Sequence, residues 1–448
     1  MTRVLIPSGA LGLGYDRAAL AAGVAAGPDL IAIDGGSTDS GPHYLGTGTS
    51  KYSRASTRAE WGELMAARRQ AGVPLVIGTA GTCGTDASVD WMLEITSELA
   101  HRADERLRVA LLKSEQSPHN MAQAFGAGRI TALPGAPQVT TDTFSACSHI
   151  VALAGAEQIQ AALATGADIV IAGRTTDTAI IAALPLARGD NPGAVWHGAK
   201  VGECGALATT RPGSGVVMLD FDADGFTITP MAEGVAATPQ TVAAHMLYEN
   251  ADPFLLYEPG GVLDVSGARY TALDARRTRV TGANWQASAD YNVKLEGARR
   301  AGFQVASLVL IRDARYIAGA RQWCADIEAE CSAKIGARLG EVSFTIELRR
   351  IGMDATLGAL EPGHVPPQEL GILAIVTAES AEAASEIAKM LNPYLLHQPL
   401  TPDEPMPTFA FPFSPPEMAR GEVYEFCLNH VLKLDNPMEA FRLEVVEI

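Results

Sequence analysis

The sequence predicts an α/β protein with a parallel-sheet N-terminal domain and a smaller α+β C-terminal domain. Two observations predict the parallel sheet. Short apolar runs of the kind that form buried strands lie at 4–7, 30–34, 75–78, 109–113, 150–154 and 169–172. Alanine-rich stretches that favour helix lie between several of these runs, at 18–26, 58–70 and 156–165. This alternation is typical of a parallel sheet with helices on both faces.

The chain has 448 residues, a length that favours two domains, which we place at 1–302 and 303–448. A hairpin around the turn at 222–225 and a helix at 238–248 elaborate the first domain. The second domain follows the order of a split β-α-β arrangement. Its expected strands and helices are strand 305–311, helix 316–335, strands 342–350 and 370–378, helix 381–396 and strand 441–447.

The composition is that of a well-packed globular protein, with 47% hydrophobic and 19% charged residues. The net charge of −17 argues against binding to nucleic acid or to an anionic membrane surface. No apolar run approaches the roughly 18 residues that span a bilayer, and the N-terminus shows no secretory signal. We therefore expect a cytoplasmic protein. The sequence contains no Walker A motif, nucleophile elbow or paired-cysteine zinc motif.

Three loops rich in hydroxyl side chains follow predicted strands, at 35–41, 79–86 and 173–178. Loops at the carboxyl ends of parallel strands gather at the ligand-binding edge of a sheet. Each Ser, Thr or Asp could instead cap the next helix, but a cap needs only one such side chain for each loop. Arg174 offers a planar fork suited to an anion. The candidate substrate-binding residues are Ser37, Thr38, Ser40, Gly81, Thr82, Thr85, Arg174, Thr175, Thr176 and Asp177.

Acid–base groups lie close to the first loop and at the end of the fourth predicted strand. A His near an Asp at a strand end is a pair suited to proton transfer. The alternatives are a structural histidine at 43 and a helix-start carboxylate at 115. The candidate catalytic residues are Asp39, His43, Tyr44, Lys51 and Glu115.

Metal and nucleophile chemistry have weaker signals. His245 and Glu249 are four residues apart on one predicted helix face, a spacing compatible with metal ligation. With no cysteine pair, we expect any bound ion to be a divalent cation such as Mg²⁺. Without an ion, Lys51 or Lys294 would stabilise the developing negative charge. Cys204 or Ser37 could act as a nucleophile, although a buried thiol is more often inert.

Several separated motifs follow one another along the chain, at 33–42 with 44–46, 81–86, 172–178, 247–253 and 258–261. Together they resemble the bacterial acyclic terpene utilisation family of the AtuA type. The resemblance spans roughly residues 3–350 and is less clear over the last hundred.

The resemblance implies a cytoplasmic catabolic enzyme, a lyase or hydro-lyase acting on a small branched or hydroxylated carboxylate or its CoA thioester. The alternatives are a hydrolase with a Cys or Ser nucleophile, and a non-catalytic ligand-binding or assembly subunit. We expect a homo-oligomer that binds a small anionic substrate.

Overall fold

The computed structural model describes residues 1–363 and 365–448. Contacts divide the chain into two compact units, Met1–Arg299 with Phe426–Ile448, and Arg300–Glu425. This division is based on contacts within the chain and does not test the predicted domain boundaries, so domains 1–302 and 303–448 stay a prediction. In the part of the chain described, no helix combines the length and the apolarity needed to cross a bilayer.

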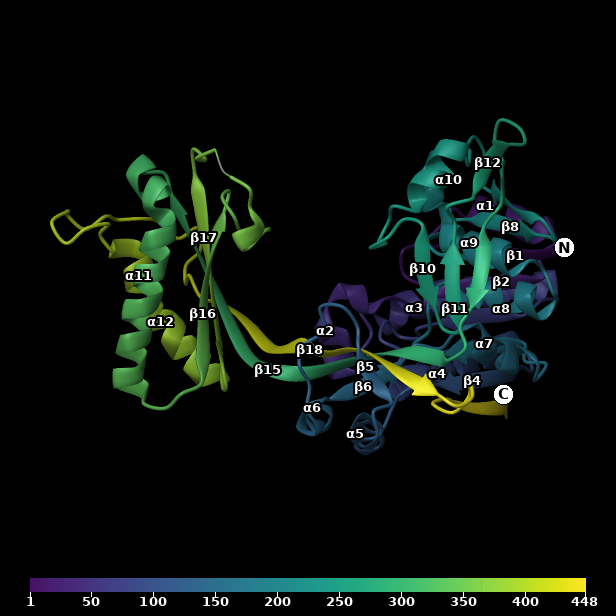
Figure 1. Cartoon of the computed structure of the whole chain (residues 1–448), viewed down its shortest axis with the longest axis horizontal. Coiled ribbons are helices and arrows are strands. Elements are labelled where there is room, and N and C mark those ends of the chain that lie inside the picture. Colours follow the sequence, from purple (N-terminus) through teal and green to yellow (C-terminus); the bar gives the residue numbers. More distant parts are fainter. Residues whose placement is uncertain (364) are drawn as a thin grey trace. The chain divides into compact units, whose positions relative to one another are not determined.

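A ten-stranded sheet forms the centre of the larger unit among the described residues (Figure 1). Its strands, in order across the sheet, are β12 (Arg269–Ala272), β13 (Thr278–Thr281), β9 (Gly225–Pro230), β8 (Val217–Phe221), β1 (Thr2–Ile6), β2 (Leu30–Asp34), β3 (Leu75–Gly78), β7 (Ile169–Ala172), β4 (Arg108–Lys113) and β19 (Arg442–Glu447). The central run β1-β2-β3-β7-β4 is parallel, and the flanking pairs are antiparallel. The predicted α/β class is confirmed, and the sheet is mixed.

Two predicted strands pair elsewhere than expected. β6 (His149–Ala152) joins β15 (Tyr291–Ile311) in an antiparallel pair and lies outside the parallel run. β19 was expected in the C-terminal domain, yet it pairs with β4 at one edge of the large sheet. An apolar run indicates that a strand is buried, but it carries no information about which distant strand its backbone will meet.

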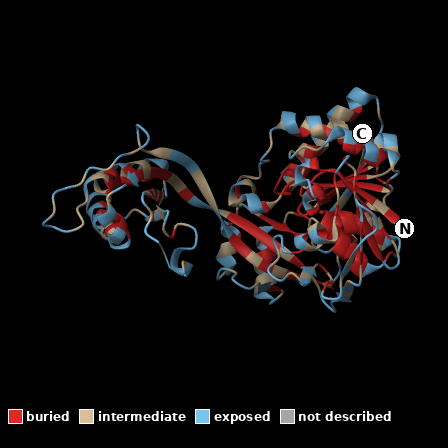
Figure 2. Ribbon diagram, turned by 90° about the horizontal axis from the view of Figure 1, so that it is seen from above, coloured by how far each residue is buried: buried red, intermediate tan, exposed pale blue. Residues whose placement is uncertain are grey.

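Burial on both faces explains why the central strands are so apolar. Every residue of β2, β3 and β7 is buried, as a sheet covered on both sides requires. One face packs on α1 (Arg17–Ala25), α3 (Arg54–Ala71) and α4 (Asp86–Ala103). The opposite face packs on α7 (Ala156–Leu163), α8 (Ala179–Ala187) and α9 (Pro192–Gly202). Figure 2 shows these buried residues in red through the sheet and its helices.

Local signals set the ends of the helices that lead into the loops. Ser53 caps α3, its Oγ accepting the Ser56 N–H at 3.2 Å, and the helix ends at Gly72 in the left-handed region. Thr85 caps α4 by accepting the Ser88 N–H at 3.3 Å. The cap interpretation of the second loop is therefore confirmed for Thr85.

The larger unit also contains short elements around the loops. The short helices are η1 (Thr38–Ser40), η2 (Gly205–Ala208), η3 (Pro212–Ser214), α2 (Pro42–Thr47), α5 (Pro118–Gly126), α6 (Thr141–Ala146) and α10 (Pro239–His245). The short strands are β5 (Ile130–Ala132), β10 (Leu255–Glu258), β11 (Gly261–Asp264) and β14 (Asn284–Ala287). Three of these strands form a second, antiparallel sheet in the order β10-β11-β14. The predicted hairpin is confirmed as β8 and β9, whereas the predicted helix at 238–248 ends early, at His245.

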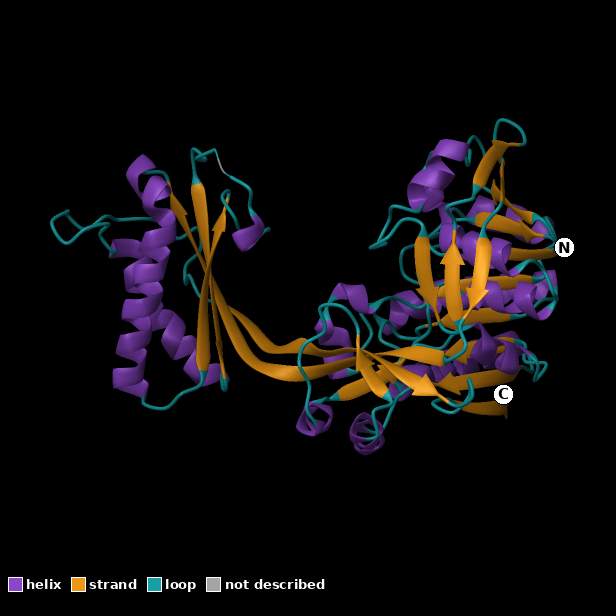
Figure 3. Cartoon of the chain, in the orientation of Figure 1, coloured by secondary structure: helices purple, strands orange, loops and turns teal. Residues whose placement is uncertain are grey.

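The smaller unit packs two helices on an antiparallel sheet (Figure 3). Residues 303–311 of β15 pair with β17 (Leu370–Ala378), which pairs with β16 (Phe344–Ile351). Alternate residues of β17 are buried, against α11 (Ala314–Leu339) and α12 (Ala381–His397). These elements lie close to their predicted positions. Two further elements, β18 (Met418–Leu434) and the short η4 (Gly358–Leu360), were not predicted.

Candidate functional site

The three hydroxyl-rich loops meet at the carboxyl ends of β2, β3 and β7. The Gly35 N–H donates to the Gly78 carbonyl at 2.7 Å, and the Thr82 N–H donates to the Gly35 carbonyl at 3.2 Å. The Thr79 N–H donates to the Gly173 carbonyl at 2.8 Å. The predicted convergence of the loops is therefore confirmed, and backbone hydrogen bonds hold it.

Arg174 lies at the centre of this junction and is buried. Its Nε donates to Glu296 Oε2 at 3.0 Å. Its Nη1 lies 3.2 Å from both Thr79 Oγ1 and the Thr175 carbonyl, and its Nη2 lies 3.2 Å from Thr38 Oγ1. One guanidinium thus connects all three loops to β15.

Glu296 completes the charge balance of the junction. Its Oε1 accepts from Lys294 Nζ at 3.0 Å, and Thr38 Oγ1 donates to its Oε2 at 3.0 Å. Burial opposes ionisation of this carboxyl, but Arg174 and Lys294 outweigh it and lower the pKa of Glu296 to about 2. The pair is therefore fully charged at neutral pH. Its geometry makes Arg174 an anchor for the loops, and its predicted binding of a substrate anion stays a prediction.

A cavity of about 650 Å³ opens beside this junction. Its wall contains two cations, Arg174 and Lys200, and six carboxylates among the described residues. The carboxylates are Asp39, Asp177, Glu203, Glu249, Asp252 and Glu258. Because Glu296 already neutralises Arg174, the wall has a surplus of negative charge.

Glu203 and Lys200 form a buried ion pair at this wall, hydrogen-bonded from Lys200 Nζ to Glu203 Oε1. They lie at the end of α9, whose residues from Gly193 to Gly202 are all buried. Burial raises the pKa of Glu203, while the adjacent Lys200 ammonium acts in the opposite direction and favours the ionised carboxylate.

Glu258 lies where the acidic cavity meets a second cavity of about 290 Å³. The walls of both cavities include Leu153, Thr176, Tyr257 and Glu258, and Leu133 and Val431 add apolar surface to the second. Glu258 Oε1 accepts from Thr178 Oγ1 at 2.5 Å. Its Oε2 is enclosed and has no hydrogen-bond partner among the described residues. Burial of the carboxyl raises the pKa of Glu258 to about 7, while Thr178 and Thr176 lower it.

Of the five predicted catalytic residues, Asp39 lines the acidic cavity. The other four lie outside its described wall. His43 is exposed on α2, and its ring meets the edge of Tyr44, which packs on the small cluster of Leu45 and Cys83. Lys51 is exposed and its Nζ lies 3.3 Å from Ser40 Oγ.

Glu115 belongs to a different polar cluster. Its Oε1 lies 2.6 Å from His149 Nδ1, and its Oε2 accepts the Asp86 N–H at 3.0 Å. Arg442 of β19 pairs with Asp86. Glu115 and His149 lie within hydrogen-bonding distance of each other, but neither appears in the described wall of the acidic cavity.

The predicted substrate-binding residues separate into a lining set and a supporting set. Arg174, Thr176 and Asp177 line the acidic cavity. The supporting set does not appear in its described wall. Ser37 caps η1, and Thr82 Oγ1 accepts the Lys51 N–H. The remaining members are Thr38, Ser40, Gly81, Thr85 and Thr175.

The predicted metal pair on one helix face is wrong in its geometry. α10 ends at His245, and Glu249 lies beyond it with a φ of 55°, in the left-handed region. Glu249 lines the acidic cavity, whereas His245 lies close to Glu203 and Cys204. Among the described residues, Glu203, Cys204 and His245 form the group of potential ligands close enough together to hold a metal ion.

Sequence reasoning left Lys200, Glu203 and Glu258 out of the candidate site. A usable signal existed for the first two, because charges three residues apart in an otherwise buried helix must pair or face a cavity. Glu258 stands before Pro259-Gly260-Gly261, a turn that ends β10 and holds the carboxyl at the cavity wall. Its role could not be deduced without knowing which cavity the turn faces.

The fold and the site define an α/β protein with an acidic cavity at the carboxyl ends of parallel strands. The chain belongs to the acyclic terpene utilisation family AtuA, whose family model matches residues 50–190 and 192–406. Membership suggests a role in acyclic terpene utilisation. The predicted resemblance is confirmed, and it extends beyond residue 350, although the motif at 33–46 precedes the match. The chain matches no curated protein and no solved structure.

Proposed function

We propose that this protein is a hydro-lyase that acts on a branched, hydroxylated acyl group carried as a CoA thioester. The single observation that carries this proposal is the position of Glu258. Glu258 lines both the acidic cavity and the smaller cavity, and one oxygen of its carboxyl group has no hydrogen-bond partner among the described residues. A carboxyl in that place is suited to moving a proton on a bound substrate.

The two cavities suit a substrate with a polar head and an apolar branched chain. The smaller cavity, with Leu133, Leu153 and Val431 in its wall, would take the chain. The acyl head would lie at the acidic wall. A thioester head is uncharged, whereas a free carboxylate would face a wall with six carboxyl groups. The two cations of that wall already have buried partners, Arg174 in Glu296 and Lys200 in Glu203. The wall therefore favours the thioester over the free acid.

The reaction would be a reversible elimination of water. Glu258 accepts the proton from the α-carbon, and Lys200 stabilises the charge that develops on the thioester oxygen. The carbon–oxygen bond at the β-carbon breaks, and the α,β double bond forms. The hydroxyl leaves as water with a proton from an acidic group of the wall.

The hydrolase alternative has less support. Burial raises the pKa of the Cys204 thiol, and the neighbouring Glu203 carboxylate raises it further, so little thiolate is present at neutral pH. Ser37 Oγ accepts the Asp39 N–H at 3.1 Å as a cap. The non-catalytic alternative predicts ligand binding without turnover.

The test is turnover of a branched 3-hydroxyacyl-CoA to the enoyl-CoA, measured by mass spectrometry in both directions. We expect Glu258→Gln to lower kcat about 10²–10⁴-fold, the usual contribution of an acid–base group. Glu94→Gln, on the exposed face of α4, is the matched control and should keep full activity. Tight binding without turnover by the unaltered protein would instead support a ligand-binding subunit.

The predicted homo-oligomer and Mg²⁺ dependence belong to the same proposal. Light scattering on the purified protein measures the first. Turnover after prolonged chelation, with and without added Mg²⁺, measures the second.

A further inference from the structure

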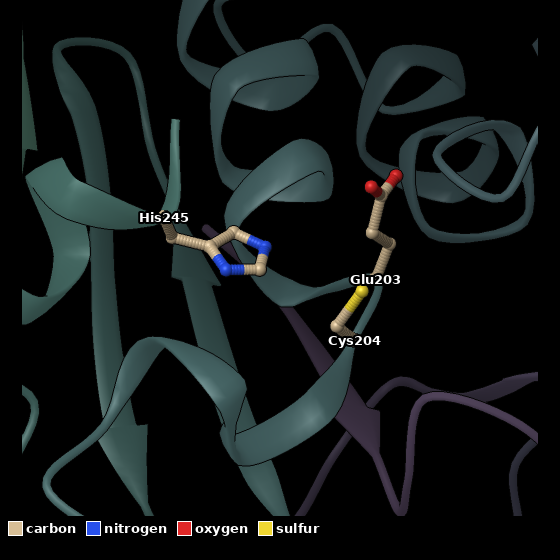
Figure 4. Close-up of side chains that lie close together, drawn as sticks. All are labelled: Glu203, Cys204 and His245. Atoms are coloured by element: carbon tan, nitrogen blue, oxygen red, sulfur yellow. The ribbon is translucent and has the colours of Figure 1, made fainter. Parts of the chain in front are cut away.

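Three chemically different metal ligands meet at the end of α9. Glu203 follows the last residue of that helix, Cys204 is next in the chain, and His245 is the last residue of α10. One ligand atom from each lies within 4.8 Å of the other two. Figure 4 shows the imidazole of His245 extending toward Cys204 and Glu203.

His245 supplies the independent sign that a ligand is missing. The side chain is 5% exposed, and its Nε2 is buried without a hydrogen-bond partner among the described residues. The imidazole also makes a hydrogen bond with the backbone of Lys200. Metal-binding histidines are typically held in this way, with one ring nitrogen fixed by a backbone group and the other directed at the metal. A buried nitrogen left unpaired is otherwise unfavourable.

The backbone around Cys204 is held rigidly. A Cβ on Gly9 would lie 3.1 Å from the Cys204 Cα, so the loop at 7–14 packs directly on it. Gly205 has a φ of 60°, which turns the chain into η2. All six cysteines are described, and Cys204 is the one that is not buried. The backbone of Cys204 is therefore closely packed, while the residue is partly exposed.

We propose that Glu203, Cys204 and His245 bind a divalent cation of the borderline class, with Zn²⁺ the best fit. Sulfur, imidazole nitrogen and carboxylate oxygen are the three ligand types that Zn²⁺ uses in proteins. Mg²⁺ prefers oxygen ligands and would not select this set. Three protein ligands leave a fourth position for water or substrate. The inference goes beyond the proposed function and does not depend on it.

Lys200 is compatible with this site. Its Nζ pairs with one oxygen of Glu203, which leaves the second carboxylate oxygen for the ion. In the metal-free protein Lys200 balances the charge of Glu203. The ion would add positive charge to a wall that carries six carboxylates.

The site is tested with two metal ions, Co²⁺ and Zn²⁺, in the absence of any substrate. Stripped protein is titrated with Co²⁺, and a thiolate ligand is expected to give a charge-transfer band in the near ultraviolet. Zn²⁺ binding is measured by competition with a chromophoric chelator, with an expected stoichiometry of about one ion for each chain. Zn²⁺ should also slow alkylation of Cys204 by iodoacetamide, read at its own peptide. Neither readout requires catalytic activity.

The variants Cys204→Ser and His245→Gln should each weaken Zn²⁺ binding at least about 100-fold, since even outer-shell changes weaken it 10–100-fold. The exposed His119→Gln on α5 is the matched control and should bind as the unaltered protein does. Absence of the Co²⁺–thiolate band in the unaltered protein would overturn the proposal. So would a folded Cys204→Ser variant that binds Zn²⁺ with unchanged affinity.

Discussion

At the scale of single residues, the Arg174–Glu296 pair is the interaction that holds the loop junction together. Both side chains are buried, and the bonds from Arg174 reach Thr38 and Thr79 in two other loops. A buried charge that loses its partner is strongly destabilising, whereas an exposed pair contributes little. The two kinds of pair can be compared within the larger unit.

We expect Glu296→Gln to lower the free energy of unfolding by about 3 kcal/mol, because buried Arg174 loses its closest charged partner and keeps only Asp177, at 3.7 Å. Urea unfolding followed by tryptophan fluorescence measures this, since four of the five tryptophans, at 61, 91, 196 and 285, lie in the larger unit. Glu447→Gln removes an exposed partner of Arg108 and should produce no measurable change. Equal effects of the two variants would contradict the anchoring role.

The same pair predicts a specific dependence of stability on pH. The pKa of Glu296 is about 2 in the folded protein, against an ordinary value of 4.5. A lowered folded-state pKa stabilises the protein above the unfolded pKa, and this contribution is lost as the pH falls. The stability difference between the unaltered protein and Glu296→Gln should therefore be constant above about pH 5. It should shrink steadily as the pH falls toward 2, and a difference that grew on acidification would reverse the sign that we assign.

Much of this residue-level site lay outside the reach of the sequence. Arg174 and Thr38 were predicted to meet because both follow buried strands. Glu296 lies 258 positions after Thr38, and nothing local marks it as their partner. The Lys200–Glu203 pair was visible as spacing, yet its direction toward the cavity depends on how α9 packs.

At the scale of elements, α9 positions the candidate metal ligands by packing tightly on the sheet. A Cβ on Gly198 would lie 2.4 Å from Phe221 Cε1 and 2.9 Å from Phe226 Cγ. Both rings are fully buried, so they have little room to move. Glycine at this position is what lets α9 approach the β8–β9 hairpin.

We expect Gly198→Ala to destabilise the larger unit by about 1–3 kcal/mol, the usual effect of overpacking a core. Gly126→Ala on α5 is the matched control, because a Cβ there meets nothing within 4 Å. The control should be neutral or slightly stabilising, since alanine favours helix. The midpoints of urea unfolding compare them, and a neutral Gly198→Ala would show that α9 can shift.

The sequence predicted elements best where burial and periodicity agree. Strands β2, β3, β7 and β17 match their predicted bounds because full or alternating burial leaves an unambiguous pattern. The partners of β6 and β19 could not be predicted, since pairing depends on contacts between residues far apart in the chain. The helix at 238–248 was predicted too long because the left-handed turn at Glu249 gives no periodic signal.

At the scale of the whole molecule, a bound cation should act on the stability of the protein. A ligand that binds only the folded state stabilises it in proportion to the logarithm of its concentration above Kd. Zn²⁺ at 100 times its Kd should raise the free energy of unfolding by about 2.7 kcal/mol, and chelation should remove the gain. Cys204→Ser should show no such gain. A stabilisation of equal size in that variant would place the ion elsewhere.

The net charge and the family assignment are also properties of the whole chain. The chain has a net charge of −17, and several of its carboxylates line the acidic cavity. The net charge alone could not indicate where in the fold those carboxylates lie. The separated motifs were sufficient to predict the family, but they could not indicate which of their carboxylates face the cavity. That information comes from the way the loops and β10 fold together.

The most direct test of the central claim, proton transfer by Glu258, is deuterium exchange at the α-carbon of a branched 3-hydroxyacyl-CoA in D₂O. Mass spectrometry detects the exchange even where overall elimination is slow. We predict incorporation by the unaltered protein and by Glu94→Gln, and a rate at least about 100-fold lower for Glu258→Gln. Exchange by Glu258→Gln at the rate of the unaltered protein would contradict the account.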